Sequence, residues 1–165
     1  VTRKITQAIA NIIYGKQKIL TLGNLDAKRD WGHAKDYVEG MWRIVQQNLA
    51  SDYILATGET HSVREFVELA FSLVDIPIKW QGTGLQEIGI DGNNGKILVK
   101  IDPQYFRPTE VDYLLGDASK AKQQLGWKPT VTFRELVKEM MMADLEKIKK
   151  TLKTKIPESQ GNLLI

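Results

Sequence analysis

The sequence predicts a mixed α/β fold in which short strands lie among amphipathic helices. Two features support this class. Several segments carry apolar residues at the i, i+3 and i+4 spacing of a helix, and short apolar runs bounded by glycine or proline separate them. A chain of 165 residues with 42% hydrophobic content is long enough for one compact domain, or for one half of a larger enzyme.

Five helices are expected, and two of them have strong N-terminal signals. Ser62 with Glu65, and Thr132 with Glu135, each match the capping-box pattern ahead of an apolar stripe. Gly126 is placed to end a short helix that begins near Asp117. The expected helical ranges are 2–14, 33–48, 62–74, 117–126 and 132–150.

Strands are expected where short apolar runs lack helical spacing. The run at 53–56 ends close to Gly58 and predicts a buried strand. The pairs Asp91-Gly92 and Asn94-Gly95 predict the turn of a hairpin. The expected strand ranges are 19–22, 53–56, 78–80, 87–90 and 96–101. The folded part is expected to cover residues 1–150, and residues 151–165 to form a polar, disordered tail.

The bulk properties exclude several functional classes. With 23 basic and 20 acidic residues the net charge is only +3, so no strong field draws the chain to nucleic acid or to a membrane surface. The absence of cysteine excludes disulfides, thiol nucleophiles and thiolate metal sites. No apolar run approaches the roughly 20 residues of a membrane span, so we expect a cytoplasmic protein. The chain begins with valine, already in a helical pattern, which indicates a start within a longer protein.

The common catalytic and cofactor motifs are missing. Gly82, Gly84 and Gly89 lack the spacing of a dinucleotide fingerprint and precede a hairpin pattern instead of a helix, so we interpret them as loop residues. His33 and His61 are far apart in sequence, and no thiols accompany them, so a structural role is favoured over a metal site.

Three charged clusters are not explained by periodicity. They are Lys28-Arg29-Asp30-Trp31, the segment YFRPTEVD at 105–112, and Arg3-Lys4. Arginine suits bidentate binding of phosphate oxygens, and the carboxylate of Glu110 can accept a bond from a ribose hydroxyl. The alternative is a set of surface salt bridges worth at most ~1 kcal/mol each. In that case Arg29 pairs with Asp26, Asp30 or Asp36, and Arg107 pairs with Glu110. Trp31 and Trp42 are expected in the core.

The amino-acid sequences in and around these clusters resemble those of a known family. The strings LGNLDAKRDWGHAKDYVEGMW, ATGETHSVREFVELAF, RPTEVDYLLGDASKAKQQLGWKP and the opening VTRKI are similar to the C-terminal half of GDP-mannose 4,6-dehydratases, which are extended short-chain dehydrogenases/reductases. The resemblance runs from Val1 to about Lys150. It implies a lyase that converts GDP-mannose to GDP-4-keto-6-deoxymannose, with NADP as internal hydride carrier.

The resemblance also implies a substrate site without catalytic residues. Arg29 and Arg107 match the arginines that hold the diphosphate, and Glu110 matches the acceptor for ribose hydroxyls. Lys4 matches a substrate-contacting lysine, and Val1 sits where the family backbone approaches guanine. No residue matches the catalytic groups, a metal site or the NADP-binding loop, which belong to the family's Rossmann half.

Two functions of different class remain open. The first is the substrate-binding part of a dehydratase that is inactive alone, partners its Rossmann half and forms a homo-oligomer when intact. The second is a stand-alone nucleotide-sugar-binding module without activity. A nucleic-acid-binding domain is disfavoured because the sequence has no basic stripe with interleaved aromatic residues. The start at valine favours the first.

Overall fold

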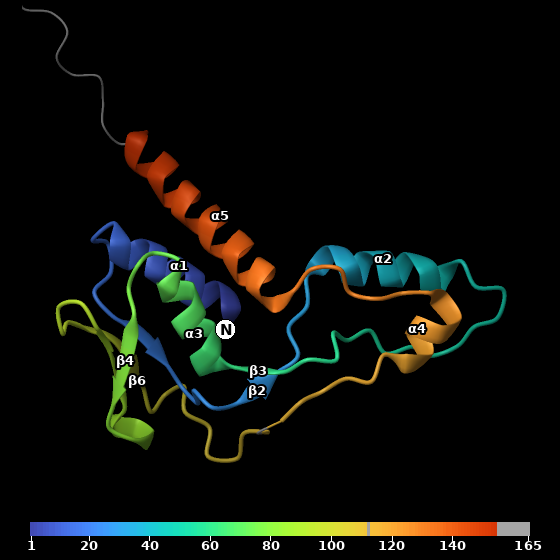
Figure 1. Cartoon of the computed structure of the whole chain (residues 1–165), viewed down its shortest axis with the longest axis horizontal. Coiled ribbons are helices and arrows are strands. Elements are labelled where there is room, and N and C mark those ends of the chain that lie inside the picture. Colours follow the sequence, from blue (N-terminus) through green and yellow to red (C-terminus); the bar gives the residue numbers. More distant parts are fainter. Residues whose placement is uncertain (112, 155–165) are drawn as a thin grey trace, which may run out of the picture.

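The larger part of the molecule is a four-stranded sheet covered by three helices. A computed structural model describes residues 1–111 and 113–154 (Figure 1). The strand order is β1-β6-β5-β4, in which β1 and β6 are parallel and the other neighbours are antiparallel. The strands are β1 (Leu20–Leu22), β4 (Ile78–Gln81), β5 (Ile88–Asp91) and β6 (Ile97–Ile101). The predicted 87–90/96–101 hairpin is confirmed, and Gly95 adopts a positive φ of 75° in its turn.

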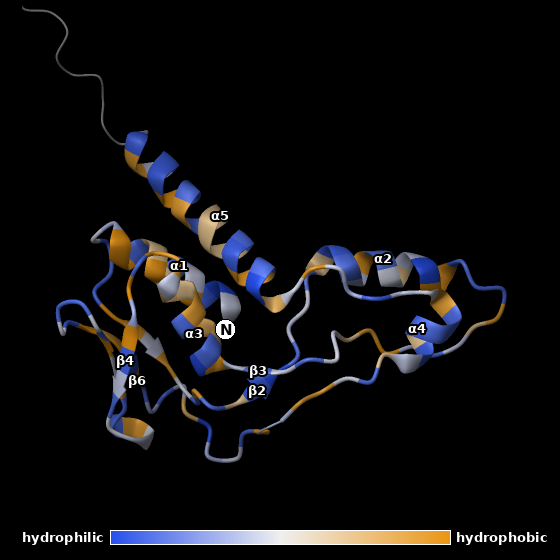
Figure 2. Cartoon of the chain, viewed as in Figure 1, coloured by the Kyte–Doolittle hydropathy of each residue, from blue (hydrophilic) through white to orange (hydrophobic). Residues whose placement is uncertain are grey.

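Three helices pack on one another over this sheet: α1 (Thr2–Ile13), α3 (Val63–Ser72) and α5 (Phe133–Lys153). Both predicted capping boxes are present at the starts of α3 and α5. The central core residues, among them Ile9, Phe66 and Val99, are fully buried. Figure 2 shows hydrophilic and hydrophobic residues alternating along α5, as expected of a helix with one buried face.

A second, smaller cluster lies to the side of this core, where α2 (Ala34–Val45) meets α4 (Ser119–Leu125) (Figure 1). Ala121, Leu125 and Trp127 form its buried centre. Gly40 of α2 faces Trp127 and Leu55 so closely that an added Cβ would lie 2.6–2.9 Å from their side chains, which would then have to shift. As predicted, Gly126 ends α4 in the left-handed conformation.

Several sequence predictions need correction. Residues 53–56 form no strand, and Ile54 is 58% exposed, because in the described part of the chain this segment has no strand to pair with. Asp117 is not the N-cap of α4; Ala118 is, although the Asp117 carboxylate accepts the amide of Ser119 at 2.9 Å. α5 extends to Lys153, into the predicted tail, and residues 155–165 of that tail lie outside the described residues. No helix in the described ranges is long and apolar enough to cross a membrane.

Candidate functional site

The Arg29-Asp30-Trp31 segment directs three successive side chains to three different places. Arg29 ends β2 (Lys28–Arg29), which pairs antiparallel with β3 (His61–Ser62), an element the sequence did not predict. Trp31 packs edge-on to Phe66 with ring centroids 5.4 Å apart, so it lies against the core as expected. This anchoring leaves Arg29 on the side of β2 that faces the 105–111 segment.

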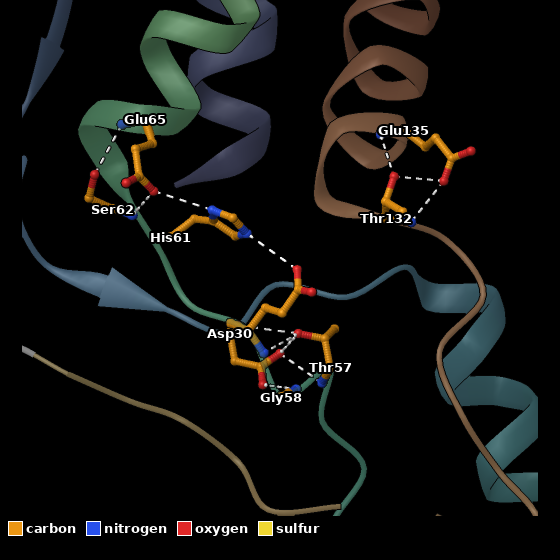
Figure 3. Close-up of polar contacts among 9 residues, drawn as sticks. Asp30, Thr57, Gly58, His61, Ser62, Glu65, Thr132 and Glu135 are labelled. Atoms are coloured by element: carbon orange, nitrogen blue, oxygen red, sulfur yellow. Dashed lines mark hydrogen bonds and ion pairs between the residues drawn. The ribbon is translucent and has the colours of Figure 1, made fainter.

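Asp30 ties this segment to the loop at residues 57–58. Its carboxylate accepts hydrogen bonds from the amide and hydroxyl of Thr57, at 2.9 and 2.6 Å, and from the amide of Gly58 at 3.0 Å (Figure 3). Nearby, His61 extends between this loop and the capping box of α3, where its Nδ1 lies 3.2 Å from a Glu65 carboxylate oxygen (Figure 3). Asp30 therefore holds the chain next to Arg29 and is not its ion-pair partner.

The second arm of the site comes from the loop after β6. The side chain of Asn24, just beyond β1, accepts the Arg107 amide at 2.8 Å and donates to the Arg107 carbonyl at 2.9 Å. Pro108 follows directly and restricts Arg107 towards an extended backbone. Arg107 is exposed, and its guanidinium has no hydrogen-bond or ion-pair partner within residues 1–111 and 113–154.

A cavity of about 400 Å³ lies between these arms. All five residues proposed from the sequence, Val1, Lys4, Arg29, Arg107 and Glu110, line it. Its lining also includes Leu22, Gly23, Asn24, Ala27, Val63 and Tyr105. Three cationic side chains and one carboxylate therefore surround the cavity, which favours an anionic ligand. A neighbouring cavity of about 610 Å³ shares Gly23, Asn24 and Ala27 with it.

Arg29 is paired, but its partner is Glu110. The Nη2 atom donates to Oε1 of Glu110 at 2.5 Å, and Nη1 donates to the carbonyls of Lys28 and Val111, each at 2.7 Å. The salt-bridge alternatives that join Arg29 to an aspartate, or Arg107 to Glu110, are therefore wrong. The pair is partly buried, with side-chain exposures of 23% and 19%. Within residues 1–111 and 113–154, the Nε–H and one Nη2–H of Arg29 have no acceptor and can donate to a ligand.

Lys4 contributes a cation whose position is fixed by an aromatic ring. Its Nζ lies 3.3 Å from the centre of the Tyr105 ring. Burial lowers the pKa of Lys4 from its usual value, and the negative charge of Asp102 partly opposes this effect. Tyr105 and Asn24 were not singled out from the sequence. Tyr105 lies within the charged segment 105–112, but Asn24 lies outside all three clusters. Both contacts join segments about 80 residues or more apart, so local sequence did not indicate them.

Other predicted residues have structural roles. His33 caps α2 by accepting the Lys35 amide at Nδ1, 3.1 Å away, and its Nε2 contacts Glu139 at 3.2 Å. Trp42 is 58% exposed, so its expected place in the core is wrong: it lies on the outer face of α2. Among the residues that the structure covers, no group of three or more His, Cys, Asp or Glu could hold a metal ion.

The glycines rejected as a cofactor fingerprint lie in a β-rich segment. Gly84 begins a 3-10 helix (η1, Gly84–Gln86), which follows β4, and Gly89 lies within β5. A pyrophosphate site of the Rossmann type needs a tight turn between a strand and a helix N-terminus. These residues do not fit a dinucleotide.

The sequence comparisons with known proteins agree on one family. The sequence profile described as GDP-mannose 4,6 dehydratase matches residues 1–140. The GDP-mannose 4,6 dehydratase of Drosophila melanogaster is 57% identical over 150 residues, which cover 91% of this chain and 38% of the fly protein. The GDP-mannose 4,6-dehydratase of Sinorhizobium fredii is 57% identical over 92% of this chain and 43% of its own length. This chain thus spans about two fifths of the relatives it matches.

A solved structure supports the fold. RMD from Pseudomonas aeruginosa, complexed with NADPH, superposes with a TM-score of 0.69 at 18% identity, over 88% of this chain and 42% of that protein. At this identity the likeness shows the fold alone, and it confirms the mixed α/β class expected from the sequence.

Proposed function

The chain belongs to the GDP-mannose 4,6-dehydratase family, and from this premise we propose that residues 1–150 are the nucleotide-sugar-binding part of such an enzyme. The observation that carries the proposal is the cavity in which Val1, Lys4, Arg29, Arg107 and Glu110 meet. The phosphates of a nucleoside diphosphate carry negative charge that complements the three cations of the cavity. Its ribose hydroxyls can donate hydrogen bonds to the carboxylate.

The roles follow from the contacts in the cavity. Arg29 is held by Glu110 and two carbonyls, so it presents its remaining donors to the diphosphate without first having to be ordered. Arg107, whose guanidinium has no partner among the residues that the structure describes, approaches the same anion from the opposite arm. Glu110 uses Oε1 for Arg29 and offers Oε2 to the ribose. Lys4 contacts the substrate beside Tyr105, and the backbone of Val1 approaches the base.

The dehydratase reaction itself is assigned to the complete enzyme. We propose that the complete enzyme is a lyase that converts GDP-mannose to GDP-4-keto-6-deoxymannose with NADP, in the cytoplasm and as a homo-oligomer. Gly82, Gly84 and Gly89 do not fit the cofactor, so NADP and the acid-base groups are placed in the family's Rossmann half. This chain's contribution is to bind and orient the substrate.

Titration of the 165-residue chain with GDP, followed by calorimetry or NMR, tests the proposal. Arg29→Ala and Arg107→Ala should each weaken GDP binding by roughly tenfold, because each removes charge-assisted hydrogen bonds to phosphate. Arg134→Ala is the matched control, since it removes an exposed arginine at the start of α5, away from the cavity.

Three outcomes would count against the proposal. Equal weakening in Arg134→Ala would show only a general charge effect. Loss of thermal stability in the Arg29 or Arg107 variant, without a change in affinity, would assign that arginine a structural role. Submicromolar GDP affinity of the unmodified chain would favour the stand-alone binding module, because a site enclosed from one side is expected to bind weakly.

A further inference from the structure

The segment after β1 and the loop after β6, which form two sides of the cavity, are joined by the side chain of Asn24. Asn24 pairs with the backbone of Arg107 through both ends of its amide, at 2.8 and 2.9 Å, in the manner of one step of a β-ladder. In the described part of the chain, the Asn24 side-chain amide and the backbone N–H and C=O of Arg107 make no other hydrogen bond. The amide therefore fixes both the position and the direction of the Arg107 backbone.

The neighbours of Asn24 make the same junction tight. The amide of Asp102 donates to the Leu22 carbonyl at 2.8 Å, which brings the start of the loop against the end of β1. At Gly23 a Cβ atom would lie 2.0 Å from the Tyr105 carbonyl oxygen, so only glycine permits this approach. The segment Leu22–Gly23–Asn24 thus contacts the loop at three successive points along 102–107.

In the described part of the chain, no hydrogen bond or ion pair of its own holds the Arg107 side chain. The Arg107 guanidinium is unpartnered across residues 1–111 and 113–154, whereas Arg29 has Glu110 and two carbonyls. The direction of Arg107 must therefore come from its backbone, which Pro108 restricts and Asn24 holds.

We propose that Asn24 is a positioning residue of the diphosphate site and acts on the ligand through Arg107. This inference rests on the proposed function. Without the Asn24 amide, the Arg107 backbone must be ordered when the anion binds, and the conformational entropy lost at that step weakens binding.

A double-mutant cycle tests this role with GDP as the probe and the 165-residue chain as the protein. Asn24→Ala should weaken GDP binding roughly fivefold, which corresponds to the loss of one or two ordinary hydrogen bonds. In the Arg107→Ala background the same change should weaken binding less than about twofold, because the group that Asn24 positions is already absent. Exchange of the Arg107 amide proton should become faster in Asn24→Ala without ligand, while the core amides of α1 and α3 keep their protection.

Asn93→Ala is the matched control. Its side-chain amide also joins two segments, by donating to the Asp75 carbonyl at 3.0 Å, but it lies in the β5–β6 turn outside the cavity. We expect unchanged GDP affinity in this variant.

The possible outcomes separate the two proposals. If Asn24→Ala weakens binding equally with and without Arg107, Asn24 contacts the ligand itself and the positioning role is wrong. If Asn24→Ala leaves affinity unchanged while Arg107→Ala weakens it, the positioning role is also wrong but the proposed site stands. If Arg107→Ala has no effect, the proposed function fails at this residue, and the inference fails with it.

Discussion

The two hydrophobic clusters of the molecule are stabilised in different ways. Between the sheet and α1, α3 and α5, fifteen buried apolar residues form one continuous core. Among the described residues, the cluster between α2 and α4 has three, Ala121, Leu125 and Trp127. With roughly 1.5–3 kcal/mol from each buried large side chain, burial stabilises the first core far more than the second.

Hydrogen bonds compensate for the small core of the second cluster. The carbonyl of Asp36 accepts the indole N–H of Trp127 at 2.6 Å. Its buried carboxylate accepts from the hydroxyl and amide of Thr130 and from the amide of Val131, at 2.6, 3.0 and 3.1 Å. One residue of α2 thus holds the segment that leads from α4 to α5. The smaller cluster is therefore held mainly by hydrogen bonds to Asp36, whereas the larger core is held mainly by the burial of apolar side chains.

The largest expected effect is at Asp36. Asp36→Ala should cost about 2–3 kcal/mol of local stability, because three donors lose an ionised acceptor. Hydrogen exchange should show α2 and α4 opening while α1 and α3 stay protected. The matched control is Asp52→Ala, which removes an exposed carboxylate next to Tyr53 of the same cluster. Equal loss of protection in α1 and α3 would contradict the separation of the two clusters.

The same residue predicts a pH dependence. Burial acts to raise the pKa of Asp36, but the hydrogen bonds from Thr130 and Val131, with the nearby His33, outweigh it and hold the pKa below its ordinary 3.8. The contribution of Asp36 is therefore complete above pH 3.8 and is lost as the pH falls through the lower, folded value. In the unmodified chain, the protection of α2 amides from hydrogen exchange should decline as the pH falls through this acid range. In Asp36→Ala, which lacks the titrating carboxylate, this decline should be absent.

The smallest expected effect on stability is at the outer face of α2. Val38, Met41, Trp42 and Val45 are 58–73% exposed there. Trp42→Ser should change the unfolding free energy by less than about 0.5 kcal/mol, since little packing is lost. It should reduce self-association in light scattering, because a contiguous apolar patch favours association. Leu85→Ser, at a single exposed apolar residue in η1, is the control. A monodisperse unmodified chain at high concentration would contradict the prediction.

Features that depend on local sequence were predictable. The capping boxes at Ser62 and Thr132 join residues three positions apart, and both are present. The hairpin between β5 and β6 likewise follows from its turn residues. For the site, the family resemblance named five residues from distant segments, and the fold gathers all five at one cavity.

Features that depend on distant partners were missed or misjudged. The pairing of β2 with β3 joins Arg29 to His61, and two-residue strands carry no periodicity. Residues 53–56 have the composition of a strand, but a strand needs a neighbour, which the described chain does not supply. The partner of Arg29 was misjudged because charge spacing favours aspartates within seven residues, whereas Glu110 is 81 residues away.

Titration of the isotope-labelled chain with GDP, followed by NMR, shows whether GDP binds in the cavity between Arg29 and Arg107. We expect the amide signals of Gly23, Asn24 and Arg107 to shift progressively with GDP, while those of α2 and α4 stay in place. Shifts centred on α2 and α4, or none at the cavity at saturating GDP, would contradict it.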